Sequence, residues 1–259
     1  MNWVQDSLVV AAGILAGIIN TLAGSGSLIT LPLLVFLGLP AHIANGTNRI
    51  GVIFQNITAV GTIHSRTGLN LSGSWWIIGW CLVGSLGGAA VAIQVDERWM
   101  NLALGALMVF MLGVVLFKPE KWLRPPGEPD PKAYRKPRNM LMFLAIGFYG
   151  GFIQAGVGIF LLAAMVLGAG YDLVRANTLK LAVVLIFSLP VLGIFIAGGQ
   201  VEWRYGLLLA LGQIIGAWVA ARFATGSANA ATWIRRLLIA VILASIVKFV
   251  WEFAAASGA

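Results

Sequence analysis

The residues best suited to chemistry are two clusters of amide and cationic side chains in an otherwise apolar sequence. Asn45, Asn48 and Arg49 are three and four positions apart, so on a helix they share one face. Asn177 and Lys180 show the same three-residue spacing much further along the chain. Amide, ammonium and guanidinium groups all donate hydrogen bonds, and the last two carry positive charge. The two clusters are therefore candidates for an anion-binding site.

A glycine-rich break precedes each cluster, with the sequence Gly-Ser-Gly at 24–26 and Gly-Val-Gly at 156–158. Glycine has no Cβ, so the backbone can unwind there and turn its amide groups towards a ligand. Serine hydroxyls in and after the first break add donors. The alternative is that the glycines only allow helices to pack closely. We expect the substrate-binding residues to be Gly24, Ser25, Gly26, Asn45, Asn48, Arg49, Gly156, Gly158, Asn177 and Lys180.

The composition indicates what kind of protein must position these residues. Of the 259 residues, 59% are hydrophobic and only 10% are charged, and the mean hydropathy is +0.92. A soluble domain carries about 25% charged residues, so the chain is predicted to be an all-α polytopic protein of the lipid bilayer. The net charge of +8 gathers in loops, which indicates membrane orientation rather than binding to nucleic acid. No basic residue precedes the first apolar run, which is not typical of a cleaved secretory signal.

An internal repeat organises the chain, because a shift of 132 positions aligns its two halves. Gly38 then falls on Gly170, Asn45 on Asn177, and Gly84 on Gly216. The apolar segments are expected at 3–23, 27–38, 42–64, 74–94 and 98–117 in the first half, and at 140–155, 159–169, 173–197, 205–223 and 232–254 in the second. Five spans in each half would make the halves two inverted repeats. The second segment of each half has roughly 11 residues where a span needs about 20, so short broken helices are expected after the glycine breaks.

The loop charges predict the topology and the domain boundaries. A basic, proline-rich linker, 118–138, joins a first transmembrane repeat at 1–117 to a second at 139–259. Positively charged loops stay in the cytoplasm, so the linker is expected inside and both termini outside a cytoplasmic (inner) membrane. Counting spans from the linker places Arg66, Arg222, Arg235 and Arg236 inside, and Asp6, Asp96, Glu97 and Glu202 outside. It stays open whether the short segments cross the membrane fully or turn back within it.

Few other polar residues interrupt the apolar segments. Carboxylates within them would be expected of a cation carrier, and their absence favours an anion as the substrate. His42 could carry a proton, although a lone histidine before a helix is more typical of a loop. Two histidines and one cysteine make a poor catalytic or metal-binding set, so no enzymatic activity, metal or cofactor is expected. Five amides either line a cavity or bond between helices: Asn20, Gln55, Asn56, Gln154 and Gln213.

The doubled pattern resembles a known family. The segments GLPAHIANGTNR at 38–49 and GYDLVRANTLK at 170–180 each follow a glycine-rich break and a short apolar run. This arrangement is similar to that of the TauE/SafE family, the sulfite exporter-like membrane transporters, over nearly the whole chain. The resemblance implies a fold of two inverted repeats and the export of small sulfur-containing anions such as sulfite and sulfoacetate. It also implies that residues 24, 26, 44, 45, 156, 158, 176 and 177 occupy the recurring positions of the family.

Three kinds of function remain to be compared. The first is a secondary transporter that exports a small sulfur-containing anion by alternating access, and the second is an anion channel for similar substrates. An intramembrane enzyme is the third, but no recognisable motif supports a serine with its base. Each of Arg49 and Lys180, taken alone, could instead extend its head group to the membrane interface. The expected partners are a small anionic substrate and the bilayer, and the oligomeric state is open, a homodimer being one option.

Overall fold

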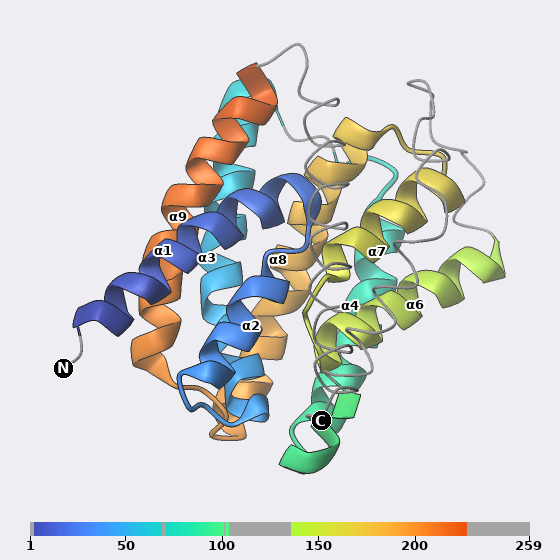
Figure 1. The fold of residues 1–259 in the computed structure, drawn as a ribbon. Coiled ribbons are helices and arrows are strands. Elements are labelled where there is room, and N and C mark those ends of the chain that lie inside the picture. Colours follow the sequence, from blue (N-terminus) through green and yellow to red (C-terminus); the bar gives the residue numbers. More distant parts are fainter. Residues whose placement is uncertain (1–2, 69–70, 101, 104–135, 227–259) are drawn as a thin grey trace, which may run out of the picture.

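The computed structural model describes residues 3–68, 71–100, 102–103 and 136–226, and these form helices and no strands (Figure 1). Helices α1 to α4 follow one another in the first half, and α6 to α9 in the second. The first set is α1 (Trp3–Ala23), α2 (Ser27–Phe36), α3 (Ala41–Thr67) and α4 (Trp75–Ala92). The second set is α6 (Pro137–Phe152), α7 (Val157–Ala163) with the π-helical turn η3 (Ala164–Gly168), α8 (Leu173–Ala197) and α9 (Trp203–Gly226).

The expected element order is confirmed over the described residues. Each half has a helix, a break, a short helix, a long polar-lined helix and an apolar helix in the same order. Gly24 and Gly156 both adopt positive φ values, 80° and 69°, and so do Gly38 and Gly170, at 93° and 81°. Two predicted segments, 98–117 for the most part and 232–254, lie outside the described residues, as does nearly all of the linker 118–138.

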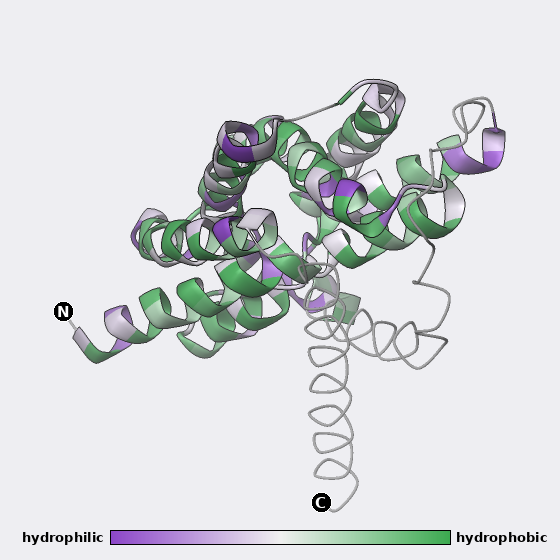
Figure 2. Cartoon of the chain, turned by 90° about the horizontal axis from the view of Figure 1, so that it is seen from above, coloured by the Kyte–Doolittle hydropathy of each residue, from purple (hydrophilic) through white to green (hydrophobic). Residues whose placement is uncertain are grey.

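Four of the described helices, α1, α4, α8 and α9, are long and apolar enough to cross a membrane. The chain is therefore a multi-pass membrane protein. Helix α3 has 27 residues, which span about 40 Å at the usual rise, but its amide and charged side chains lower its hydropathy. The amides and Arg49 are buried rather than exposed to lipid, as polar groups at membrane depth must be, whereas Arg66 near the end of α3 is exposed. Large apolar side chains such as Leu15, Leu141 and Leu211 cover the outside instead, and Figure 2 shows hydrophobic residues along most of the helices.

Helices of one half of the sequence pack mainly against helices of the other half, an arrangement called exchanged packing below. Helix α1 of the first half packs along α9 of the second, and α4 of the first half packs along α6 of the second (Figure 1). Glycines make both contacts close: a Cβ on Gly17 would lie 2.9 Å from the Cα of Gln213, and one on Gly147 would lie 2.6 Å from the Cα of Cys81. Small residues that allow backbones to approach are the usual means of helix association in lipid. For these glycines, close packing is the reason for the residue type.

Candidate functional site

The two glycine-rich breaks meet in the interior of the protein. Gly24, between α1 and α2, contacts Gly158 at the start of α7, and a Cβ on Gly24 would lie 2.6 Å from the Cα of Gly158. Gly156 precedes α7 in the left-handed conformation. Gly26 faces its own half, because a Cβ there would lie 2.7 Å from the Cβ of Asn20. A side chain at Gly24 or at Gly158 would separate the two broken segments, so glycine is required at both positions for the segments to touch.

Arg49 is fully buried on α3 and contacts the end of α6. Its Nη1 and Nη2 donate to the carbonyl oxygens of Gly150 and Gly151, at 3.1 and 2.6 Å. The guanidinium carbon lies 4.4 Å from the centroid of the Phe195 ring, while Nε has no partner. The last carbonyls of a helix lack intrahelical partners and carry partial negative charge. Arg49 therefore caps the C-terminus of α6 and does not reach the surface of the protein.

Lys180 makes the corresponding contact from α8 to the end of α1. Its Nζ donates to the carbonyl oxygens of Asn20 and Thr21, at 2.9 and 3.3 Å, and to Oδ1 of Asn177 at 2.8 Å. The amide of Asn177 donates in turn to the Thr21 carbonyl at 3.1 Å. Lys180 is only 2% exposed, so it too stays away from the surface. Each half thus supplies a cation that caps the first helix of the other half.

The two remaining amides of the first cluster hold the backbone around the breaks. Asn45 donates from Nδ2 to the carbonyl of Phe152, the last residue of α6, at 2.7 Å. Asn48, which aligns with Lys180, donates to the Ser27 hydroxyl at 3.1 Å and accepts from Thr30 at 2.6 Å. Asn48 therefore fixes the first turn of α2 to α3. The asparagine and the cationic side chains have the same structural role here, because both donate hydrogen bonds to backbone or hydroxyl groups near a break.

A small cavity of about 10 Å³ lies between α3 and α8, beside the breaks. Val52 and Val184, which align in the repeat register, both line it, so it lies between equivalent parts of the two halves. Its other lining residues are Asn20, Ser27, Asn56, Gln154, Val157, Gly158, Lys180 and Leu181. The volume is that of a single water site. No acidic side chain is among these lining residues, and Lys180 is the cationic one.

Of the ten predicted binding residues, the cavity brings together Gly158 and Lys180. The others lie around it: Arg49 and Asn45 face α6, and the Ser25 hydroxyl is buried without a partner. Asn20, Asn56 and Gln154 line the cavity as well as serving helix contacts, since Asn20 donates to Gln55 at 2.9 Å and Gln154 to Ser188 at 2.8 Å. These three residues could be recognised in the sequence because they are polar residues inside apolar segments. Hydropathy alone does not say that they face one cavity.

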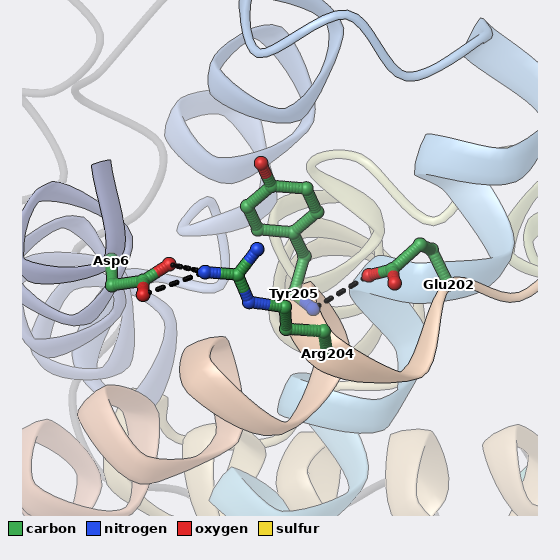
Figure 3. A network of polar contacts seen from close by, with 4 residues as sticks. All are labelled: Asp6, Glu202, Arg204 and Tyr205. Carbon is green, nitrogen blue, oxygen red and sulfur yellow. Dashed lines mark hydrogen bonds and ion pairs between the residues drawn. The ribbon is translucent and has the colours of Figure 1, made fainter. Parts of the chain in front are cut away.

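Charged residues at one end of the helices form a second polar network (Figure 3). Arg204 at the start of α9 donates to both carboxylate oxygens of Asp6 on α1, at 2.8 and 2.7 Å. Glu202 accepts from the backbone N–H of Tyr205 at 2.7 Å, which caps α9. The backbone N–H of Glu202 donates to the Thr47 hydroxyl of α3 at 2.9 Å. This network ties α1 and α3 to α9. Over the described residues, no group of three histidine, cysteine or acidic side chains could hold a metal ion.

Comparison with known proteins decides the family. The model of the sulfite exporter TauE/SafE family matches residues 9–249. The chain belongs to the TauE/SafE family. The TauE/SafE protein is 27% identical to a probable membrane transporter protein of Haemophilus influenzae over 252 residues, covering 95% of this chain and 94% of that one. It is 28% identical to the probable membrane transporter protein ORF9 of a Sinorhizobium species, with 92% and 89% covered.

A third relative is the probable membrane transporter protein YfcA of Escherichia coli K12, 29% identical with 80% of this chain and 76% of that one covered. No solved structure matches the chain. The TauE/SafE protein is thus a membrane transporter of the TauE/SafE type, and its relatives bear the names of transporters rather than enzymes.

Proposed function

We propose that the TauE/SafE protein is a secondary carrier that exports a small sulfur-containing anion, such as sulfite, sulfoacetate or a related organosulfonate, across the cytoplasmic membrane. The observation that carries this proposal is the cavity where the two broken segments meet, lined by Lys180, Gly158 and several neutral polar side chains. Paired short helices in corresponding halves are typical of transporter binding sites near the middle of the bilayer. Of the ten predicted residues, Gly158 and Lys180 line the cavity, while Asn45, Asn48 and Arg49 bond backbone and hydroxyl groups around the breaks.

The charge of the interior supports an anion as the substrate. Among the described residues, Arg49 and Lys180 donate their hydrogen bonds to neutral oxygens, and neither cation is paired with a carboxylate. Two buried positive charges favour a negative ligand, because charges in a low-dielectric interior interact strongly. The helix-terminal carbonyls offset part of this charge. A cation in the cavity would be repelled by Lys180, which lines it.

The small volume of the cavity supports alternating access. A space for one water cannot hold an oxyanion, so the helices must separate to admit it from either side. The exchanged packing places α1 and α3 with α9, and α4 with α6, whereas α8 packs against both α3 and α4. We assign α8 to the unit of α4 and α6 because it is the equivalent of α3 in the repeat register. Each unit contains helices from both sequence halves. We propose that these two units rock about the contact of Gly24 with Gly158, the halves being inverted repeats.

The positions of charged residues support the proposed orientation. Arg66 ends α3 beside the last residue of α9, since a Cβ on Gly226 would lie 3.6 Å from its Nη1. Glu202 directly precedes α9 at its other end, and Asp6 of α1 lies beside it in the network with Arg204 (Figure 3). Positive charge marks the cytoplasmic side, so we propose that the end with Arg66 and the linker 118–138 face the cytoplasm. Both termini would then lie outside.

Counterflow tests the proposal directly. Purified protein is reconstituted into proteoliposomes preloaded with unlabelled sulfite or sulfoacetate, and uptake of radiolabelled sulfite is followed. A carrier accelerates uptake only when the preloaded anion is a substrate, and the rate saturates with concentration. Flux that ignores the preload and does not saturate would instead support an anion channel. Absence of flux with every anion would contradict both.

A further inference from the structure

We infer that the anion in this cavity carries a single negative charge, and that Lys180 selects it over anions of the same shape with two charges. This inference rests on the proposed function and narrows its substrate class. Sulfite, sulfoacetate and simple sulfonates differ in net charge, so the site need not accept all of them. The structure bears on the choice because it sets how much positive charge faces the cavity.

The two buried cations do not contribute equally to the cavity. Lys180 lines it, whereas Arg49 does not. The guanidinium of Arg49 is held by Gly150 and Gly151 on one side and stacks on Phe195 on the other. At the position of Arg49, the second half has Leu181, which lines the cavity as an apolar residue. One cationic group therefore faces the cavity among the described lining residues.

Lys180 can release one hydrogen bond to an anion at little cost. An ammonium has three N–H donors, and the three acceptors of Lys180 are neutral oxygens. The longest bond, 3.3 Å, goes to the carbonyl of Thr21. That carbonyl also accepts from Asn177 at 3.1 Å, so it keeps a donor when Lys180 turns to a substrate. An anion can thus take the place of the Thr21 carbonyl as an acceptor from Lys180, while Asn177 and the bond to Asn20 keep the end of α1 capped.

The rest of the cavity offers polar groups without charge. Ser27, Asn56 and Gln154 line it, and Gln154 is buried with its Oε1 unpartnered. Because the Gln154 amide and the Ser188 hydroxyl can exchange donor and acceptor roles, the amide can turn either group to the ligand. Val52, Val157 and Val184 complete the wall with apolar surface. These groups can orient sulfonate oxygens, but they cannot neutralise a second charge.

A dianion would therefore bring an uncompensated charge into the bilayer interior. Burying an ion without a partner is strongly unfavourable, whereas one negative charge is matched by Lys180. We expect the protein to prefer methanesulfonate to sulfate, two tetrahedral anions of similar shape that differ by one charge. By the same argument ethanesulfonate is preferred to sulfoacetate, which adds a carboxylate.

Counterflow with matched anions tests this. Uptake of radiolabelled methanesulfonate is measured in proteoliposomes preloaded with methanesulfonate or with sulfate at equal concentration, at a pH where both charges are fixed. We expect methanesulfonate to accelerate uptake at least about tenfold more than sulfate. Equal acceleration, or acceleration by sulfate alone, would overturn the inference on charge and leave the carrier intact. Absence of counterflow with either preload and with sulfite or sulfoacetate would contradict the proposed function itself.

Variants at Lys180 test its role separately. Lys180→Gln should raise the half-saturating concentration of methanesulfonate about tenfold or more, because a hydrogen bond to a charged group is lost. Lys180→Arg keeps the charge and should keep the preference for methanesulfonate even if its expression or rate falls. Thr178→Ala, on the same helix but bonded only to its own backbone, is the matched control and should behave as wild type. Wild-type discrimination in Lys180→Gln would overturn the assignment of Lys180.

Discussion

Gly24 and Gly158 touch backbone to backbone, although they come from different halves of the chain. Gly24 lies in the break between α1 and α2, and Gly158 lies in the first turn of α7, directly after the break between α6 and α7. The contact brings the two breaks to the side of one cavity. Helices α1 and α6 end here, and their last carbonyls are capped by Lys180 and Arg49 from the other half. Irregular backbone at membrane depth persists only where protein or a cavity satisfies it. The contact between Gly24 and Gly158 and the caps by Lys180 and Arg49 satisfy the irregular backbone at these two breaks.

Replacement of either glycine should therefore disrupt the fold around the cavity. A Cβ on Gly24 would lie 2.6 Å from the Cα of Gly158. Alanine at this position would also have to adopt a φ of 80°, a conformation that costs a non-glycine residue about 1–3 kcal/mol. We expect Gly24→Ala and Gly158→Ala to lower the melting temperature in detergent and abolish counterflow. Gly61→Ala and Gly193→Ala are matched controls in the same repeat register, because an added Cβ at either position would meet no atom within 4 Å beyond the nearby backbone of its own helix. Thermal stability unchanged in Gly158→Ala would contradict the contact.

Arg49 is expected to act on stability more than on substrate affinity. Arg49→Ala leaves the carbonyls of Gly150 and Gly151 buried without these donors, and each bond to a charged group is worth about 1.5–3 kcal/mol. Arg49→Lys keeps the charge but cannot bond both carbonyls with a planar fork, so its stability should be intermediate. Thermal unfolding in detergent without substrate measures the effect. A fully stable Arg49→Ala with weakened anion affinity would show instead that Arg49 is a ligand.

Over the described residues, the order of the elements and the glycine-rich breaks could be predicted from the sequence, but the hydrogen-bond partners of the buried polar residues could not. The segment 173–197 coincides with α8, and 3–23 with α1. Asn45 and Asn177 were expected to be equivalent, and each indeed donates to a carbonyl at the end of the other half's first helix. Helical periodicity tells which residues share a face and not which helix covers it. The exchange of α1 and α4 between halves therefore appears only in three dimensions.

The same limit explains the interpretation of the two cations. Their spacing indicated an anion site, and an arginine or lysine near a segment start could equally extend to the interface. Neither alternative includes what the structure shows, namely that a helix end from the other half supplies negative partial charge to Arg49 and to Lys180. That end is distant in sequence, and it is a property of backbone carbonyls rather than of any side chain. Sequence reasoning therefore found the residues but not their acceptors.

If α1 and α9 move as one unit, joining them should not stop transport. Asp6 and Arg204 already link their ends through two hydrogen bonds (Figure 3). We expect Asp6→Cys with Arg204→Cys, on a Cys81→Ser background, to retain most of its counterflow after reaction with a cleavable thiol crosslinker. The same variant before crosslinking is the control. Arrest of transport that cleavage of the crosslinker reverses would show that the sequence halves, and not the exchanged units, move against each other.

Asn48 is expected to support the cavity through Ser27 rather than by contact with the substrate. Its amide bonds the hydroxyls of Ser27 and Thr30 at the start of α2, and Ser27 lines the cavity whereas Asn48 does not. Asn48→Leu would leave both buried hydroxyls without these partners, at about 1–3 kcal/mol for an unsatisfied group. Thermal unfolding should show this loss, with a rise in the half-saturating anion concentration in counterflow.

Asn48→Gln keeps an amide and should recover part of the affinity. Thr58→Val is the matched control on α3, because the Thr58 hydroxyl bonds only its own helix, at Phe54, and is exposed. Full stability of Asn48→Leu together with a lost response to anions would instead place Asn48 in direct contact with the substrate.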